Sequence, residues 1–278
     1  MDINLLLDLI EKNLPRETAM DGDRIGLQVQ AGNTDLHNLL ITMEVNDAVI
    51  DEAIELKSDC IITFHPLIFH PVLQITEEER VGKLLLKLIR NSISLIAIHT
   101  NFDSYINGTS KILCAKLNLE YQSFLVPDKT REGYGMGVVC TPKSDLEFNQ
   151  LLENISSVCN APLRYCEGKP NFSIKKIAIV GGSGSSFIDD ALNSNVDVFI
   201  TADVSYHNFH KVKGKMALID PGHYEMEQFV AKGLYDFLSA KIDNNIILNL
   251  SHSYTNPVQY FPDNSFNDKQ KKYIINKF

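Results

Sequence analysis

The amino-acid sequence predicts an α/β protein with two similar α/β lobes, each built on a mainly parallel sheet covered by helices. Short apolar runs typical of buried strands alternate along the chain with stretches of helical periodicity. The same alternation occurs in both halves of the chain, which favours two lobes. A length of 278 residues, 44% of them hydrophobic, provides enough apolar surface for two such cores.

The first half begins with a helix whose apolar residues, including Leu6 and Ile10, lie on one face. We expect Asp2 to cap this helix and Pro15 to end it, because proline cannot continue a helix. Thr76 and Glu79 have the spacing of a capping box, which predicts the start of a later helix. The elements expected in this half are a helix over 3–13, a strand over 39–43, a helix over 48–56, a strand over 60–64, a helix over 76–89 and a strand over 93–98.

The second half repeats this order of strands and helices. Its expected elements are a strand over 137–140, a helix over 145–158, a strand over 177–180, strands over 198–200 and 216–219, and a helix over 222–240. We therefore expect a first lobe over residues 1–128 and a second over 129–278. The polar tail from Asp263 to Phe278 has too weak a pattern to predict an element.

Charge and composition disfavour several classes of function. The chain carries 35 acidic against 26 basic residues and a net charge of −9, so a nucleic-acid partner is not expected. No apolar run approaches the ~20 residues needed to cross a bilayer, and the acidic N-terminus lacks the basic start of a secretory signal. We therefore expect a cytoplasmic protein without a membrane partner. The five cysteines are widely spread and include no Cys-x-x-Cys pair, so we expect buried, reduced thiols.

Residues able to bind a metal or transfer a proton follow four of the predicted strands. In parallel sheets the carboxyl ends of the strands meet at one edge, where functional sites form. The residues concerned are His65 after the strand ending at Phe64, His99 and Asp103 after Ile98, Asp203 and His207 after Ile200, and His223 and Glu227 after Ile219.

His223 and Glu227 are four residues apart at the start of a predicted helix, so both side chains lie on one face. This spacing alone is more often a solvated ion pair than a metal site. Taken singly, a residue such as His65 is more often a buried or turn histidine, and one such as Asp103 more often a helix cap or Asx-turn residue. Together, two imidazoles and two carboxylates suit a divalent metal such as zinc, manganese or iron.

The segment Gly181–Ser186 follows a predicted strand and could bind a phosphate through backbone N–H groups. It does not complete a dinucleotide-binding motif, because Phe187 occupies the position of the third glycine. Neither a P-loop lysine nor a serine-hydrolase elbow is present in the sequence. We therefore interpret this segment as a tight turn between a strand and a helix.

Six stretches of the chain, in this order, resemble the GTP cyclohydrolase I type 2 homologs, also called the Nif-three-like family. They are Asp23–Val29, Ile61–Phe69, His99–Asp103, Gly181–Gly184, Thr201–His207 and Asp220–Glu227. The family also has a longer form with an inserted domain. Too few residues separate Asp103 from Gly181 to hold that domain, so the chain resembles the short form.

The resemblance implies a ring-shaped homohexamer whose two-lobed subunits each hold a dinuclear metal centre. Many family members have a second histidine where this chain has Phe64, which cannot bind a metal, so one or two divalent ions per subunit are expected. Glu44 stands where the family usually has aspartate. By position, the metal ligands would be His65, Asp103, His223 and Glu227.

Two functions follow from this resemblance. The first is a metal-dependent hydrolase acting on GTP or another nucleotide-like compound, with a metal-activated water as nucleophile. His99 and His207 are the candidate catalytic residues for proton transfer, and His210 is a further candidate; structural packing is an equal alternative for each. The second function is a non-catalytic metal-binding regulatory or scaffold protein that forms the ring and presents its surface to protein partners.

Overall fold

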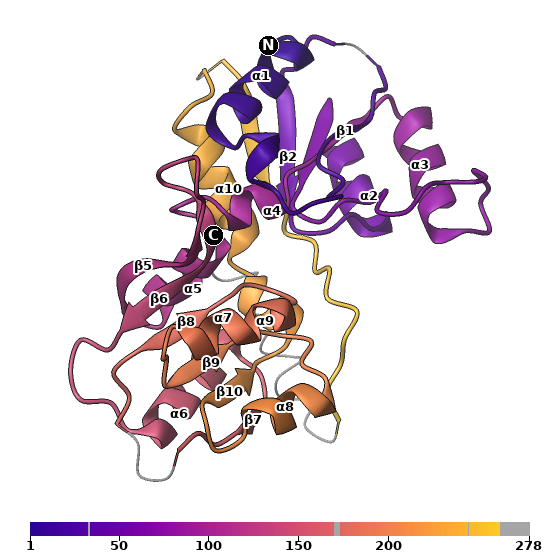
Figure 1. Cartoon of the computed structure of the whole chain (residues 1–278). Coiled ribbons are helices and arrows are strands. Elements are labelled where there is room, and N and C mark those ends of the chain that lie inside the picture. The colour runs from indigo at the N-terminus through magenta and orange to yellow at the C-terminus, as the bar shows by residue number, and fades with distance from the viewer. Residues whose placement is uncertain (33, 170–172, 244, 262–278) are drawn as a thin grey trace. The chain divides into compact units, whose positions relative to one another are not determined.

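The computed structural model describes residues 1–32, 34–169, 173–243 and 245–261, and the chain divides into two compact units (Figure 1). Unit 1 contains residues 1–102 and 230–257, and unit 2 contains residues 103–229 and continues from residue 258. The predicted boundary after residue 128 differs from this division, because 103–128 belong to unit 2 and 230–257 return to unit 1. The predicted α/β class, with two sheets covered by helices, is confirmed. The tail from Asp263 to Phe278 lies outside the described residues.

Unit 1 is built on a sheet with the strand order β1-β4-β3-β2-β11, in which only β1 runs antiparallel to its neighbour. The strands are β1 (Gly26–Val29), β2 (Asn38–Thr42), β3 (Cys60–Thr63), β4 (Ser94–Ala97) and β11 (Ile247–Leu250). The helices are α1 (Ile3–Asn13), α2 (Asp47–Glu55), α3 (Arg80–Arg90) and α10 (Val230–Ser239), with a 3-10 turn at Arg16–Thr18 and the short α4 (Thr100–Asp103) where the two units divide.

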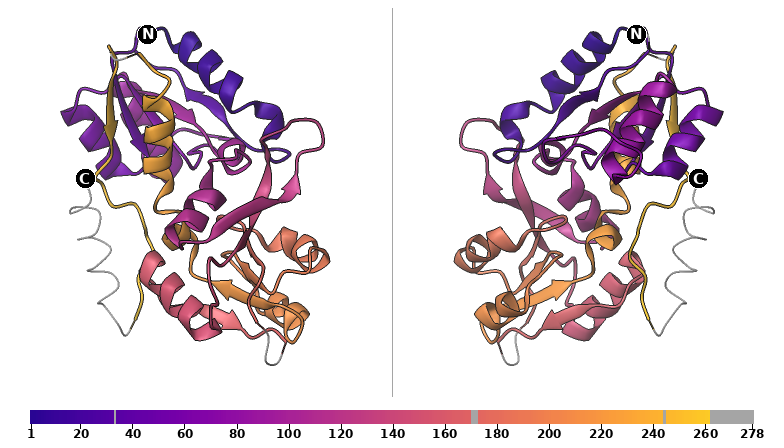
Figure 2. Two further views of the ribbon diagram at one scale, coloured as in Figure 1. Left: turned by 90° about the vertical axis from the view of Figure 1, so that its left-hand side faces the viewer. Right: turned by 90° about the vertical axis from the view of Figure 1, so that its right-hand side faces the viewer.

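Helices cover both faces of the unit 1 sheet. Leu40, Ile61 and Leu95, from three adjacent strands, pack in one cluster with the buried residues of α2 and α3. Alternate residues of these strands point to the opposite face, on which α1 and α10 lie (Figure 1). Helix α10 lies beside β11, the last described strand of the chain (Figure 2). Strands β2, β3 and β4 are therefore buried on both faces, which explains their continuous apolar runs in the sequence.

Unit 2 is built on a six-stranded sheet with the order β5-β6-β8-β9-β10-β7, whose three strands β8, β9 and β10 are mutually parallel. The outer strands pair antiparallel, so this sheet is mixed rather than mainly parallel as predicted. The strands are β5 (Glu120–Pro127), β6 (Gly135–Thr141), β7 (Arg164–Cys166), β8 (Ile177–Ile179), β9 (Val198–Ile200) and β10 (Ala217–Asp220). The helices are α5 (Thr109–Lys116), α6 (Phe148–Cys159), α7 (Ile188–Asn193), α8 (Tyr206–Val212) and α9 (His223–Glu227), with a 3-10 turn at Ser185–Phe187.

Two apolar clusters hold the helices of unit 2 against the two faces of its sheet. Ile179, Ile200 and Ile219 pack with buried residues of α5, α6 and α9. Ala178, Phe199 and Leu218 are their neighbours in sequence and pack with α7 and α8 on the other face. Because β8, β9 and β10 are parallel, their carboxyl ends meet at one edge of the sheet, where the polar residues follow.

Two predictions for the ends of α1 are confirmed. The Asp2 side chain accepts a hydrogen bond from the backbone N–H of Asn4 and so caps α1, which ends two residues before Pro15.

None of the described helices combines the length and apolar character that crossing a bilayer requires.

Two predicted helix boundaries are wrong. Helix α3 begins at Arg80 rather than near Thr76, because the chain at Thr76 folds back on the helix. A side chain at Gly82 would start 2.6 Å from the Thr76 carbonyl oxygen. The helix predicted over 222–240 is interrupted between α9 and α10, where the chain passes from unit 2 to unit 1.

Candidate functional site

In unit 2, His223 and Glu227 form the pair that their spacing predicts. Strand β10 ends at Asp220, whose carboxylate accepts the backbone N–H of Gly222 at 3.0 Å and shapes the turn into α9. His223 begins α9 and Glu227 ends it, and His223 Nε2 lies 3.0 Å from Glu227 Oε2. Glu227 is 2% exposed, so its carboxylate is withdrawn from solvent and depends on partners in the protein.

Asp203 fixes the orientation of the His223 ring. Its Oδ2 lies 2.6 Å from His223 Nδ1, the ring nitrogen opposite the one that faces Glu227. Asp203 stands in the turn after β9 with a positive φ of 54°, which brings its carboxylate to the edge where β10 also ends. A carboxylate that holds one ring nitrogen and leaves the other for a metal is a recurrent arrangement around metal-binding histidines. The sequence placed Asp203 among the polar residues that follow the strands but did not predict its contact with His223, because no short-range spacing links the two.

Two carboxylates determine the protonation of His223. Burial lowers the pKa of His223, but its hydrogen bonds to Asp203 and Glu227 and their negative charges outweigh burial and raise that pKa to about 11. The hydrogen bond from His223 in turn lowers the pKa of Asp203 below its ordinary value. At neutral pH the imidazole is therefore a cation between two carboxylates.

The glycine turn after β8 lies against the His223–Glu227 pair. Gly182 has a φ of +58°, and a Cβ added there would lie 2.5 Å from Glu227 Oε1 and 3.1 Å from His223 Nε2. The backbone N–H of Gly184 donates to Thr201 Oγ1 at 2.8 Å, so it is used within the protein. The segment is thus a tight turn, as the sequence predicts. Its glycines also allow the backbone to approach a buried carboxylate, a contact that the sequence did not predict.

In unit 1, His65 and His99 follow the neighbouring parallel strands β3 and β4, and their ring centroids are 5.5 Å apart. His65 Nδ1 lies 3.1 Å from Glu44 Oε2, and Glu44 also binds Arg80 at 3.4 Å. Burial raises the pKa of Glu44, but the hydrogen bond and charge of His65, together with Arg80, lower it overall. Glu44 therefore holds one nitrogen of the His65 ring, as Asp203 does for His223.

Phe64 fills the space beside these two histidines. It is fully buried, and its ring centroid lies 5.0 Å from that of His65 and 5.4 Å from that of His99. The residue that cannot bind a metal is thus an apolar packing partner of both imidazole rings.

His99 is held by Asp23, another residue without a predicted role. Asp23 Oδ1 lies 2.8 Å from His99 Nδ1, and its second oxygen accepts the backbone N–H and the hydroxyl of Thr100. Burial raises the pKa of Asp23, but these hydrogen bonds and the charge of His99 lower it to about 2. Asp23 is therefore a buried anion that anchors the loop before β1 to the end of β4.

This environment predicts a pH-dependent loss of stability in the Asp23→Asn variant. Because the folded-state pKa of about 2 lies below the ordinary 3.8, the charge of Asp23 stabilises the fold fully above pH 3.8 and loses its effect as the pH falls toward 2. At pH 7 we expect the free energy of unfolding of the variant to be about 2 kcal/mol lower than that of the wild type. This difference should shrink between pH 4 and 2. Urea unfolding at several pH values measures it. A difference that is unchanged in acid would contradict this assignment.

The other predicted site residues lie in unit 2. Asp103 ends α4 and is half-buried. His207 is exposed on α8, where its ring centroid lies 5.5 Å from that of Tyr206. In the described part of the chain no hydrogen bond joins His207 to His223 or Glu227. His210 is also exposed on α8, and its ring centroid lies 4.6 Å from that of Tyr206.

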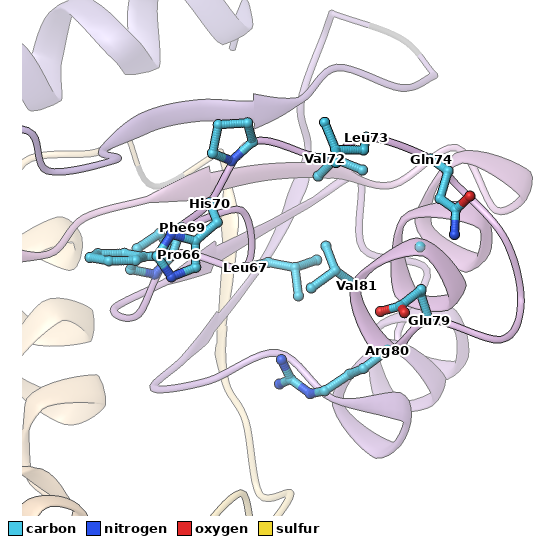
Figure 3. A pocket seen from close by; sticks show the side chains of 12 residues that line it. Pro66, Leu67, Phe69, His70, Val72, Leu73, Gln74, Glu79, Arg80 and Val81 are labelled. Atoms are coloured by element: carbon cyan, nitrogen blue, oxygen red, sulfur yellow. The ribbon is translucent and has the colours of Figure 1, made fainter.

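A cavity of about 640 Å³ in unit 1 begins directly after His65. Figure 3 shows Leu67 and Val81 facing one another across it, with Arg80 at one side. Arg80 also donates to the Val45 carbonyl at 3.0 Å, so the cavity shares a side chain with the Glu44–His65 pair. Its volume is in the range of small-molecule sites. The sequence did not predict it, because its walls come from a loop and the first turn of α3.

Comparison with known proteins identifies relatives along nearly the whole chain. The sequence model of the Duf34/NIF3 family (NGG1p interacting factor 3) matches residues 1–257. A GTP cyclohydrolase 1 type 2 homolog of Clostridium perfringens is 31% identical over 267 residues, which cover 94% of this chain and 100% of that protein. A protein of the same description from Streptococcus pneumoniae is 30% identical and covers 82% of this chain and 86% of its own. Among solved structures, the hypothetical protein SA1388 of Staphylococcus aureus superposes with a TM-score of 0.83 at 28% identity, covering 94% of this chain and 99% of its own.

Proposed function

The chain belongs to the Duf34/NIF3 family, and from this premise we propose that it is a metal-dependent hydrolase of a nucleotide-like substrate. The observation that carries the proposal is the His223–Glu227 pair, in which Asp203 holds one ring nitrogen and the other faces a buried carboxylate. This group already binds a proton tightly. A divalent cation would displace that proton from Nε2 and bind the imidazole together with the Glu227 carboxylate.

We propose His65 and Asp103 as further ligands, from their positions in the family's motifs. Both supply a donor of the type that zinc, iron or manganese accepts. The hydrogen bond between His65 Nδ1 and Glu44 supports this role, because it fixes the ring as in other metal-binding histidines. Since Phe64 offers no donor, the site holds one or two ions per subunit.

When bound, a divalent ion would supply Lewis acidity and bring the pKa of a water molecule toward ~7. The residues of the chain then position the reacting groups. Asp203 and Glu44 keep the rings of His223 and His65 in a fixed orientation. His99 accepts or returns the proton at Nε2, because Asp23 holds Nδ1. We keep His207 as a second proton-transfer candidate on the basis of its motif alone.

Metal content measured by mass spectrometry tests the ligand assignment. We expect purified wild-type protein to contain bound metal, and Asp103→Ala and Glu227→Gln to lose most of it while keeping the wild-type circular dichroism spectrum. His37→Ala is the matched control, since His37 is an exposed histidine of unit 1 whose ring pairs with the exposed carboxylate of Asp35. Unchanged metal content in both variants would remove the proposed site.

The alternative is a metal-binding regulatory or scaffold protein that forms a homohexameric ring in the cytoplasm. Phe64 favours this alternative, because it replaces a metal donor by an apolar ring packed on His65. Incubation with a panel of nucleotides and phosphoesters separates the two functions. Metal-dependent turnover that Glu227→Gln abolishes supports the hydrolase, whereas no turnover by fully metal-loaded protein supports the scaffold.

A further inference from the structure

Two cysteines of unit 2, far from each other in sequence, meet in the core. Cys114 on α5 and Cys140 on β6 have their sulfur atoms 2.8 Å apart, although 26 residues separate them along the chain. A disulfide needs the sulfurs to approach by a further ~0.8 Å. From this contact we propose that Cys114 and Cys140 are a redox modification site, at which a peroxide converts the two thiols reversibly into a disulfide.

The reaction balances with one peroxide molecule. The Cys114 thiolate attacks a peroxide oxygen, the O–O bond breaks, and the sulfur is oxidised to a sulfenic acid. The leaving oxygen departs as hydroxide, which takes up the proton that the Cys114 thiol released and becomes water. The Cys140 sulfur then attacks the Cys114 sulfur, so that the S–S bond forms and the S–O bond breaks. The hydroxyl leaves with the Cys140 proton as a second water. A dithiol reductant reverses the change by thiol–disulfide exchange.

The surroundings distinguish this pair from the other buried cysteines. The hydrogen bond from Cys140 lowers the pKa of Cys114 against the effect of burial, and the charges of Lys111 and Lys143 act in the same direction. Burial instead raises the pKa of Cys60, and it raises that of Cys159 to about 12. Cys114 is thus favoured as the thiolate that reacts first.

Both sulfurs are buried, since Cys114 is 1% and Cys140 is 0% exposed. Peroxide therefore reaches them only when α5 separates locally from β6, and we expect oxidation over minutes to hours rather than seconds. Once formed, the bond links α5 to β6 and closes the chain between them. The oxidised protein should therefore melt at a higher temperature than the reduced protein.

Peptide mapping of the full-length protein tests the proposal. Reduced protein is treated with hydrogen peroxide, its free thiols are blocked with N-ethylmaleimide under denaturing conditions, and the peptides are analysed by mass spectrometry. We expect one linked pair of peptides containing Cys114 and Cys140, which disappears after incubation with dithiothreitol. Cys60 and Cys159 should be recovered as blocked thiols, which makes them internal controls for burial.

The Cys140→Ser variant provides a second measurement. Without its partner, Cys114 should be recovered as a sulfenic or sulfinic acid, and the rise in melting temperature after peroxide should be lost. Because the mapping is done on the wild-type chain, it does not depend on the folding of this variant. Recovery of both cysteines as blocked thiols at a peroxide dose that oxidises the exposed methionines would overturn the proposal, as would their irreversible oxidation without a link.

Discussion

Replacing Asp203 by alanine should weaken metal binding by about 10- to 100-fold, although Asp203 is not a proposed ligand. The variant loses the 2.6 Å hydrogen bond to His223 Nδ1. The ring can then rotate, and either of its nitrogens can carry the proton. Asp203 is the half-exposed partner in this pair, with 53% of its side chain accessible, so the fold should tolerate the change. Titration against a fluorescent zinc chelator measures the affinity.

Two further variants sharpen this measurement. Asp203→Asn keeps an oxygen that can accept from Nδ1 and should recover part of the affinity. Asp189→Ala removes an exposed carboxylate of the same unit that pairs with Lys211, and should leave the affinity unchanged. Equal affinities in Asp203→Ala and wild type would show that the orientation of His223 does not depend on Asp203.

Gly182→Ala should disturb both stability and metal binding. Its φ of +58° costs any other residue about 1–2 kcal/mol. The added methyl group would also lie 2.5 Å from Glu227 Oε1, so the carboxylate must move away from His223. We expect the free energy of unfolding to fall by at least the conformational cost and the metal affinity to fall at least tenfold.

The Gly214→Ala variant separates the effect of the backbone conformation from that of the contact with Glu227. Gly214 has a similarly positive φ of +75° in the same unit, but no atom lies within 4 Å of a Cβ added there. This control should lose only the conformational part of the stability and should keep its metal affinity. If urea unfolding and metal titration gave the same result for both glycine variants, the contact between the turn and Glu227 would contribute neither to stability nor to metal binding.

The elements that alternate as buried strands and amphipathic helices were predictable from sequence, because their periodicity is local. Strands β5 and β11 were not, since much of their surface is exposed and their patterns are weak. Strand β7, which is only three residues long, was not predicted from the sequence either. The division of the chain also depends on distant pairing, because β11 joins the sheet next to β2.

The same distinction holds for the candidate site, where contacts set by local spacing were predictable and contacts between distant residues were not. His223 and Glu227 are neighbours because of helical geometry, which the spacing alone reveals. The residues that orient the histidines come from separate parts of the chain: Asp203 is 20 positions from His223 and Asp23 is 76 positions from His99. No short-range rule of sequence connects such pairs.

Unit 1 is built from two segments of the chain, so its sheet cannot be completed until the second segment has been synthesised. Strands β2, β3 and β4 emerge early, but β11 and α10 are synthesised only after residues 103–229. Until then the β2 edge presents unpaired backbone groups, which favour association with other chains. A nascent chain should therefore need protection at this edge, and expression of residues 1–102 alone should give an aggregating fragment.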